Sequence, residues 1–205
     1  MSPATLITLI TAGISIWALY NRQLLSKLIL SPYAVVHEKR WYLILTHAFI
    51  HINWTHLIFN MIALWSFGMA VEQYFSLITT SPGLHFYLLY FGAVVFSSLP
   101  DLIKKKDNPD YLTLGASGGV SAVVFAAIFF NPWHRIYVFF LPCPGVVFGA
   151  LYLIYCSYQS KKGVADRINH DAHFYGSVFG FLYPVLIEPS SFLQCFVYQL
   201  MHPVF

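Results

Sequence analysis

Long apolar runs alternate with short polar stretches along the chain, and this pattern predicts a bundle of membrane-crossing helices. A helix needs about 20 apolar residues to cross the hydrocarbon core of a bilayer. The chain has 205 residues, so roughly six crossings would nearly fill it. The predicted crossings cover residues 4–20, 54–75, 84–103, 117–130, 146–158 and 172–187. We therefore expect an all-α, polytopic membrane protein with six transmembrane helices.

Two segments are too polar to cross but carry many aromatic residues. The first, residues 21–53, is interrupted by Pro32 and contains Trp, Tyr, Phe and His side chains together with Lys and Arg. Aromatic and basic side chains together are typical of elements that lie at the membrane surface. We expect this first loop to be interfacial, and we expect the same of the tail from Phe192.

The composition supports a lipid environment. Hydrophobic residues make up 58% of the chain and charged residues 9%, whereas soluble domains carry about 25% charged residues. We expect residues 1–205 to form one membrane domain, with no separate soluble domain. The formal charge of +3 is small and scattered over several loops, which argues against a nucleic-acid partner. The three cysteines are widely spaced and suggest neither a disulfide framework nor a zinc site.

The fourth run is unusually short for a crossing helix. From Ser117 to Phe130 it gives only ~21 Å of helix at ~1.5 Å per residue, against a hydrocarbon core of roughly 30 Å. One end must therefore lie below the membrane surface, where a water-filled cavity is needed to satisfy its backbone groups. Ser117 at the beginning of this helix fits such a sunken end.

Four polar residues within the predicted crossings are candidates for chemistry, because polar groups inside a membrane are costly. His56 and Asn60 are four residues apart and so share one helix face. Ser117 begins a helix, where free N–H groups favour a developing anion. His173 lies near the beginning of the last crossing. A serine taken singly is more often a packing residue, so the interpretation depends on the combination.

Glycines indicate how the serine and the histidine could meet. Gly176 and Gly180 form a G-x-x-x-G pattern, which allows two helix backbones to approach closely. The fourth run offers a partner face of small residues, namely Gly118, Ser121 and Ala122. Close packing would bring Ser117 within reach of His173, as a serine nucleophile with a histidine base requires. His56, Asn60 and the Ser117 backbone N–H could then stabilise the oxyanion.

Three segments together resemble the rhomboid family of intramembrane serine proteases. "GASGGVSA", from Gly115, resembles the family's G-x-S-G motif. "HINWTHLIFNMIALWSFG", from His51, resembles its second crossing with H-x-x-x-x-H-L-x-x-N-M. "DAHFYGSVFG", from Asp171, resembles its A-H-x-x-G-x-x-x-G segment. The motifs occur in the family's order, and the resemblance covers residues 40–187.

The resemblance implies a six-helix bundle with a Ser117–His173 dyad and an oxyanion site of His56, Asn60 and the Ser117 backbone. Gly115, Gly118, Gly176 and Gly180 would support the site by packing. Transmembrane proteins would be cleaved in or near their membrane segments, without a metal ion or another cofactor. The location implied is a bacterial cell (inner) membrane. Ser121 stands where many members place an aromatic ring against the histidine, so water or a backbone carbonyl would have to orient His173 instead.

Other interpretations of the same residues are weaker. His47, His51 and His56 could in principle bind a metal, but no H-E-x-x-H motif is present. The G-x-S-x-G match to α/β-hydrolases lacks the strand that must precede it. Asp171 suggests a triad, but we interpret it as a helix N-cap on another face.

Two further classes of function remain as alternatives. The first is an inactive rhomboid-like protein that binds transmembrane segments without cleaving them. Complete serine, histidine and asparagine positions argue against it. The second is a transporter, which is a weaker alternative because crossings two to six show no obvious inverted repeat and no charged residue deep in a crossing.

The loop charges conflict with the orientation that the resemblance implies. With six crossings, every Lys and Arg except Arg135 lies on the Ser117 side, which the positive-inside rule places in the cytoplasm. Bacterial rhomboids have both termini in the cytoplasm and a site that opens outward. We expect the family's orientation.

Overall fold

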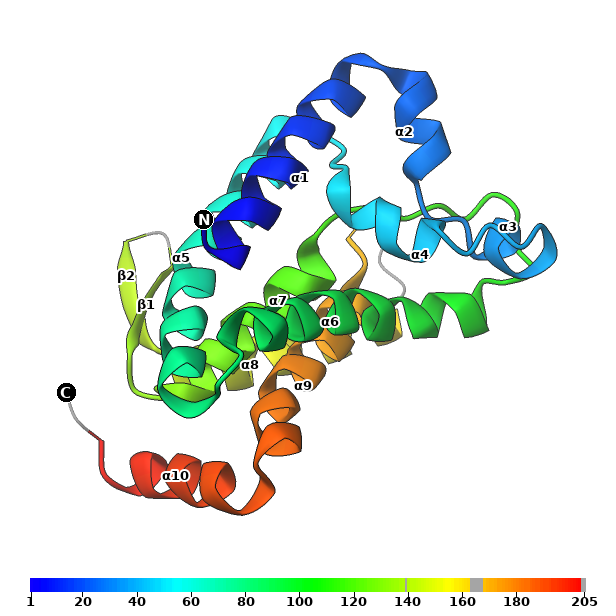
Figure 1. The fold of residues 1–205 in the computed structure, drawn as a ribbon. Helices are drawn as coiled ribbons and strands as arrows, with labels where there is room; N and C mark the ends of the chain where they lie inside the picture. The colour runs from blue at the N-terminus through cyan, green and yellow to red at the C-terminus, as the bar shows by residue number, and fades with distance from the viewer. Residues whose placement is uncertain (139, 163–167, 204–205) are drawn as a thin grey trace.

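The computed structural model describes residues 1–138, 140–162 and 168–203, and these fold mainly into helices (Figure 1). Between the last two predicted crossings the sequence SKKGVADRINHD predicts a polar loop, of which residues 163–167 lie outside the described residues. Six long helices occupy the predicted runs: α1 (Pro3–Tyr20), α5 (Trp54–Ile78), α6 (Pro82–Lys104), α7 (Ser117–Phe130), α8 (Gly145–Lys162) and α9 (His170–Ile187).

Helix α7 is the centre of the bundle. It packs against α5, α6 and α9, and most of its residues are buried. Its small residues permit this packing: a methyl group placed on Gly119 would lie 2.7 Å from the ring of Tyr90 on α6. A helix surrounded in this way can be short, because its ends are covered by protein instead of lipid.

The first loop folds into four short helical segments, of which the second and third lie beside one end of α6 (Figure 1). They are α2 (Arg22–Leu28), α3 (Pro32–His37), α4 (Leu43–Thr46) and the 3-10 turn η1 (His47–Phe49). Leu30 exchanges two backbone hydrogen bonds of 3.0 Å with Thr113, just before the Ser117 helix. Val35 and Leu43 are buried within the loop's own apolar cluster. The loop is therefore anchored to the segment that leads into Ser117.

One feature differs from the sequence expectation, and another adds to it. Residues Arg135–Val138 (β1) pair antiparallel with Leu141–Pro144 (β2), so the all-α prediction is wrong for this short hairpin. Ile136 and Tyr137 are residue types that favour strands.

The tail forms a further helix, α10 (Pro189–Met201). Trp133 holds this helix by donating hydrogen bonds from its indole to Gln199 O and Leu200 O.

Within the described residues, α1, α5 and α6 are each long and apolar enough to cross a membrane. Helix α9 together with α10 passes the same test as a bent pair, which gives three or four candidate spans. Helix α7 is apolar but has only 14 residues. Helix α8 ends in the polar sequence QSKK and does not pass on composition. Length and composition thus support fewer crossings than the six predicted.

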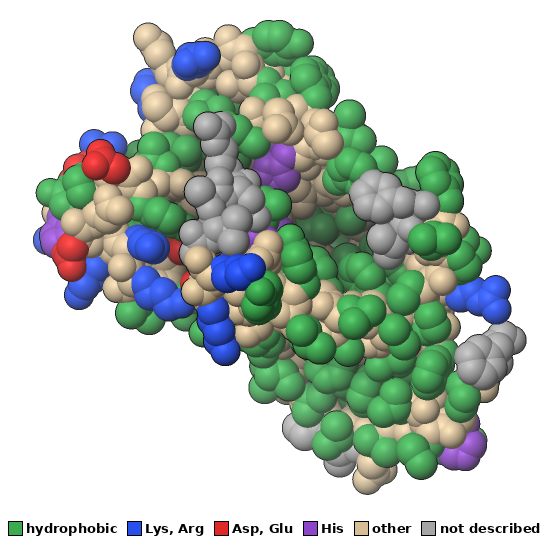
Figure 2. Space-filling model, turned by 180° about the vertical axis from the view of Figure 1, so that it is seen from behind, with side chains coloured by type: hydrophobic (Ala, Val, Ile, Leu, Met, Phe, Trp, Pro, Cys, Tyr) green, Lys and Arg blue, Asp and Glu red, His purple; other side chains and the backbone are tan. Residues whose placement is uncertain are grey.

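The surface is typical of a protein surrounded by lipid. Figure 2 shows hydrophobic side chains over most of one face, with most of the charged side chains toward one edge. Large apolar residues project outward from the long helices, including Trp17, Phe59 and Trp65. These side chains would be unfavourable in water over so wide an area.

Candidate active site

Ser117 is the first residue of α7, and a glycine turn places it there. Gly115 has a φ of +121°, a conformation that L side chains rarely adopt. Its N–H donates to His47 O at 2.9 Å. A methyl group on Gly115 would lie 2.7 Å from His56 Cε1, so glycine also lets the His56 ring approach the turn.

The α7 and α9 backbones touch through glycines. A methyl group on Gly176 would lie 2.9 Å from the carbonyl carbon of Gly118, and one on Gly180 would overlap the backbone of Ala122. A Cβ essentially never approaches backbone this closely. His173 lies one turn before Gly176 and hence on the same face of α9. The close contact therefore places His173 beside the first turn of α7.

The four predicted polar residues line one cavity of about 220 Å³. Helix α5 contributes His56 and Asn60, α7 contributes Ser117, and α9 contributes His173. The remaining walls are largely apolar and include Phe59, Val124, Phe125 and Phe148. Because the free N–H groups of the first turn of α7 begin at this cavity, a developing negative charge on a bound group would be stabilised there.

His56 and Asn60 are coupled to each other along α5. Asn60 is buried, and its Nδ2 donates a hydrogen bond of 2.9 Å to His56 O. An amide nitrogen carries two hydrogens, so this bond leaves Asn60 a second one to donate. The His56 ring lies edge-on to the His51 ring, with centroids 4.8 Å apart. His51 thereby restricts the orientation of His56.

Both ring nitrogens of His51 have hydrogen-bond partners, and one of these bonds holds the turn before Ser117. Its Nε2 accepts a bond of 3.4 Å from the Ala116 N–H, and its Nδ1 lies 2.8 Å from Ser15 Oγ. Burial lowers the pKa of His51 to about 3, which keeps the ring neutral. With both nitrogens engaged, His51 is unsuited to the metal trio with His47 and His56 that we considered from the sequence.

A small polar pocket lies on the other side of Ser117. It is lined by His47, Ser98, Asp101 and Asn169 and has a volume of about 10 Å³, which is room for about one water molecule. His47 Nε2 lies 3.2 Å from Ser98 Oγ, and Asn169 Nδ2 donates to Asp101 Oδ2 at 2.5 Å. Ser117 therefore borders a polar pocket as well as the larger apolar cavity.

Tyr152 of α8 is a site residue that the sequence analysis missed. Its hydroxyl lies 3.0 Å from His173 Nδ1, and its ring stacks on the His173 ring with centroids 6.2 Å apart. The same hydroxyl lies 3.4 Å from Ser121 Oγ. We expected water or a backbone carbonyl to orient His173, and a side chain from a third helix contacts it instead.

Asp171 forms an ion pair between helix ends and does not cap α9. The N-cap of α9 is Asn169, whose side chain accepts a hydrogen bond of 3.0 Å from the Ala172 N–H. The N-cap prediction for Asp171 is therefore wrong. Its carboxylate instead pairs with Lys104 Nζ at 2.8 Å and accepts a hydrogen bond from Ser160. Asp171 thus connects the ends of three helices.

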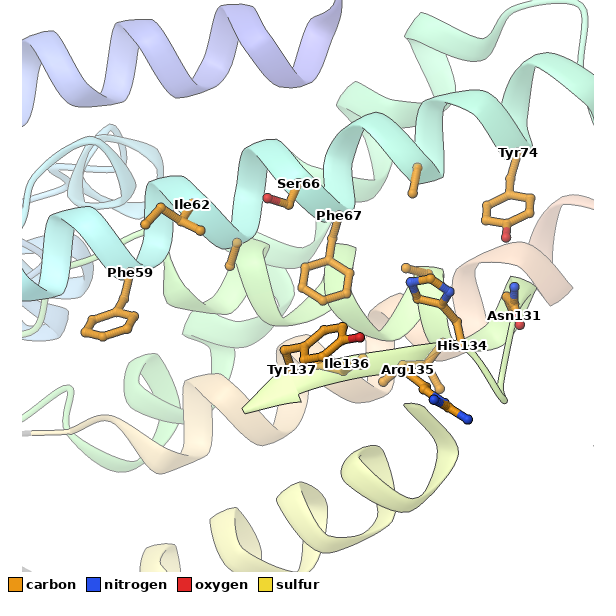
Figure 3. A pocket seen from close by; sticks show the side chains of 14 residues that line it. Phe59, Ile62, Ser66, Phe67, Tyr74, Asn131, His134, Arg135, Ile136 and Tyr137 are labelled. Carbon is orange, nitrogen blue, oxygen red and sulfur yellow. The ribbon is translucent and has the colours of Figure 1, made fainter. Parts of the chain in front are cut away.

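An apolar groove continues from the cavity along α5. Its volume is about 560 Å³, and Phe59 and Ala63 line both spaces. Figure 3 shows Phe59 and Phe67 projecting from α5 toward β1, and His134 pointing back toward α5. The groove is wide enough for apolar side chains of a bound segment and leads to the Ser117 cavity.

Taken together, the structure is that of a helical membrane protein with a serine and a histidine at a cavity inside its bundle. The rhomboid domain matches residues 38–190, which is most of the chain. The chain belongs to the rhomboid family, and it is a multi-pass membrane protein.

Three relatives show the range of this similarity. The chain is 28% identical over 149 residues to RHOMBOID-like protein 12, mitochondrial, of Arabidopsis thaliana, covering 67% of this chain and 44% of the relative. It is 33% identical over 147 residues to Rhomboid protein 1, mitochondrial, of Saccharomyces cerevisiae, covering 68% and 40%. It is 29% identical over 96 residues to Rhomboid protease GluP of Bacillus subtilis, covering 47% and 17%. The chain thus spans less than half the length of each relative.

Proposed function

We propose that this chain is an intramembrane serine protease that cleaves transmembrane proteins in or near their membrane segments. The observation that carries the proposal is the glycine contact between α7 and α9, which places Ser117 and His173 on one cavity. A binder of transmembrane segments has no need for a serine and a histidine on one cavity, or for glycines that bring their two helices into contact. The name of one relative, a rhomboid protease, points the same way.

The proposed chemistry is acyl transfer through a Ser117–His173 dyad. Ser117 Oγ attacks the scissile carbonyl while His173 accepts its proton, and His173 then protonates the leaving amine. A water molecule deprotonated by His173 hydrolyses the acyl-enzyme and regenerates Ser117. The polar pocket beside Ser117 supports this step, because it can hold a water molecule inside an otherwise apolar bundle.

The proposed oxyanion site consists of the Ser117 backbone N–H and the side chains of His56 and Asn60. All three residues line the cavity, and the N-terminus of α7 adds its positive dipole end. Gly115 and Gly118 support the site because a side chain on either would displace a neighbour, His56 in the first case and Ser97 in the second. We propose no metal ion or other cofactor for this reaction.

The substrate would enter along the apolar groove between α5 and β1. Its lining by Phe59, Ile62, Phe67 and Tyr74 suits the apolar side chains of a transmembrane segment (Figure 3). We propose that α7, α8 and α9 cross together with α1, α5 and α6, which gives a six-helix bundle. The membrane proposed is a bacterial cell membrane; the relatives are named from mitochondria and from a bacterium.

The test is cleavage of a purified single-span model substrate in proteoliposomes. The wild-type chain should yield two fragments, and Ser117→Ala and His173→Ala should each abolish them while keeping the wild-type elution volume. Binding of the substrate by the wild-type chain without cleavage would instead support the inactive rhomboid-like alternative.

A further inference from the structure

We infer that Tyr152, assisted by Ser121, is the positioning residue that fixes the tautomer and the ring plane of His173. The inference rests on the proposed function, since it assigns a role relative to the reaction of Ser117. Three side chains from three helices carry it: Ser121 from α7, Tyr152 from α8 and His173 from α9.

The tautomer decides which direction the hydrogen bonds must take. Tyr152 OH lies 3.0 Å from Nδ1 of His173, which leaves Nε2 as the ring nitrogen to serve Ser117. A histidine base must present an unprotonated nitrogen to the serine, so the proton of the neutral ring has to reside on Nδ1. Nδ1–H then donates to the Tyr152 oxygen, and the tyrosine acts as an acceptor.

Ser121 makes this direction favourable. A tyrosine hydroxyl carries one hydrogen and can accept as well, so the hydrogen must point elsewhere if the oxygen is to accept from Nδ1. Ser121 Oγ lies 3.4 Å from the Tyr152 oxygen and can accept that hydrogen. The resulting chain runs from His173 Nδ1–H to Tyr152 and from Tyr152 O–H to Ser121. The reverse direction would place the imidazole proton on Nε2, where it blocks the transfer from Ser117.

Packing holds Tyr152 in this place. Its ring is stacked on Phe148, with centroids 5.6 Å apart, and lies 6.0 Å from the ring of Phe125. The His173 ring is nearly parallel to it, at an interplanar angle of 16°. Cys156, one turn further along α8, also interacts with Tyr152 and is an alternative receiver of its proton.

The experiment combines kinetics with the state of the histidine ring. Tyr152→Phe keeps the stacked ring and removes only the hydroxyl. We expect kcat to fall about 10- to 100-fold, the range typical when a group that orients a metal-binding histidine is lost, with little change in KM. Ser121→Ala should lower kcat less, and Ser121→Thr should restore most of it. Tyr158→Phe, at an exposed position on α8, is the matched control and should match the wild type.

A spectroscopic readout separates positioning from general damage. In protein with ¹⁵N-labelled histidine, with His173 assigned by difference from His173→Ala, the wild type should show Nδ1 protonated in the neutral ring. Tyr152→Phe should shift His173 toward the Nε2–H form. Unchanged kcat and an unchanged tautomer in Tyr152→Phe, with Ser117→Ala inactive, would overturn the inference and leave the proposed function standing. A loss in Cys156→Ala together with none in Ser121→Ala would overturn the part assigned to Ser121.

Discussion

Gly180 of α9 lies directly on the backbone of Ala122 of α7, with no room for even a methyl group between the two helices. Gly176 makes the same contact with Gly118 one turn closer to the site. The two contacts fix both the distance and the rotation of α9 relative to α7. Ser117 and His173 therefore owe their common cavity to residues that carry no chemistry.

This contact predicts a sharp dependence of stability on the glycines. Gly180→Ala should lower the free energy of unfolding by about 1–3 kcal/mol, because overpacking forces the helices apart. Gly13→Ala is the matched control: apart from its own stretch of helix, no atom lies within 4 Å of a methyl group placed there, and alanine favours a helix over glycine by up to about 1 kcal/mol. Thermal unfolding in detergent measures both. Equal midpoints for the two variants would contradict the packing that we describe.

The oxyanion site predicts graded kinetic losses on α5. His56→Ala and Asn60→Ala should each lower kcat by on the order of 10²–10³, the usual effect of removing one oxyanion donor. The double variant should lose less than the product of the two, because both donors serve the same anion. Steady-state cleavage of the model substrate measures the three variants. Wild-type rates in both single variants would exclude α5 from the site.

Replacement of Asp171, in contrast, should have little effect on cleavage. Asp171→Asn breaks only its pairing with Lys104, a partly exposed ion pair whose contribution to stability is about 0–1 kcal/mol. We expect cleavage within a few-fold of the wild type. A loss as large as that of His173→Ala would instead establish Asp171 as a third catalytic group.

The buried histidines of the first loop predict acid sensitivity. Burial lowers the pKa of His47 to about 4 and that of His51 to about 3, from 6.5. The folded chain therefore binds these protons more weakly than the unfolded chain. The free energy of unfolding keeps its full contribution from each neutral histidine above about pH 6.5. This contribution is lost as the pH falls toward 4, by on the order of 3 kcal/mol per histidine. The temperature midpoint of unfolding should therefore decrease as the pH is lowered from 7 to 5. The decrease should be less steep in His47→Gln. A midpoint that rises on acidification would contradict this.

The position of Cys195 allows the orientation of the chain in the membrane to be tested by cysteine labelling. Cys195 lies on α10, which Trp133 holds near the Phe130 end of α7, opposite Ser117. If the site opens outward, a membrane-impermeant maleimide should label a variant with Cys195 as its only cysteine after permeabilisation and not in intact cells. Labelling in intact cells would favour the orientation that the loop charges indicate.

The helix positions could be predicted because the apolar runs end at strong polar or Pro-containing breaks. Helix α7 begins at Ser117 and ends at Phe130 as expected. The hairpin of β1 and β2 was missed, since each strand has only four residues and two of the four in β2 are prolines, which leaves no alternating period to detect. The cap of α9 was misplaced by two residues, because Asn169 and Asp171 are both good capping residues and only the helix start distinguishes them.

The role of Tyr152 could not be predicted for a different reason. The chain has 14 tyrosines, and nothing local in α8 distinguishes this one. Its position depends on the distance between α8 and α9, which is set by contacts between residues far apart in sequence. Ser121 gave the one available signal, since a small polar residue facing the histidine leaves space that another side chain must fill.

The most direct test of the central claim is labelling of Ser117 by a fluorophosphonate probe in detergent, followed by mass spectrometry of the modified peptide. Such probes react with serines that a neighbouring base activates. The wild-type chain should be labelled at Ser117 only, and both Ser117→Ala and His173→Ala should lose the label while remaining folded. Failure of the folded wild-type chain to react, or undiminished labelling of His173→Ala, would contradict a Ser117–His173 dyad.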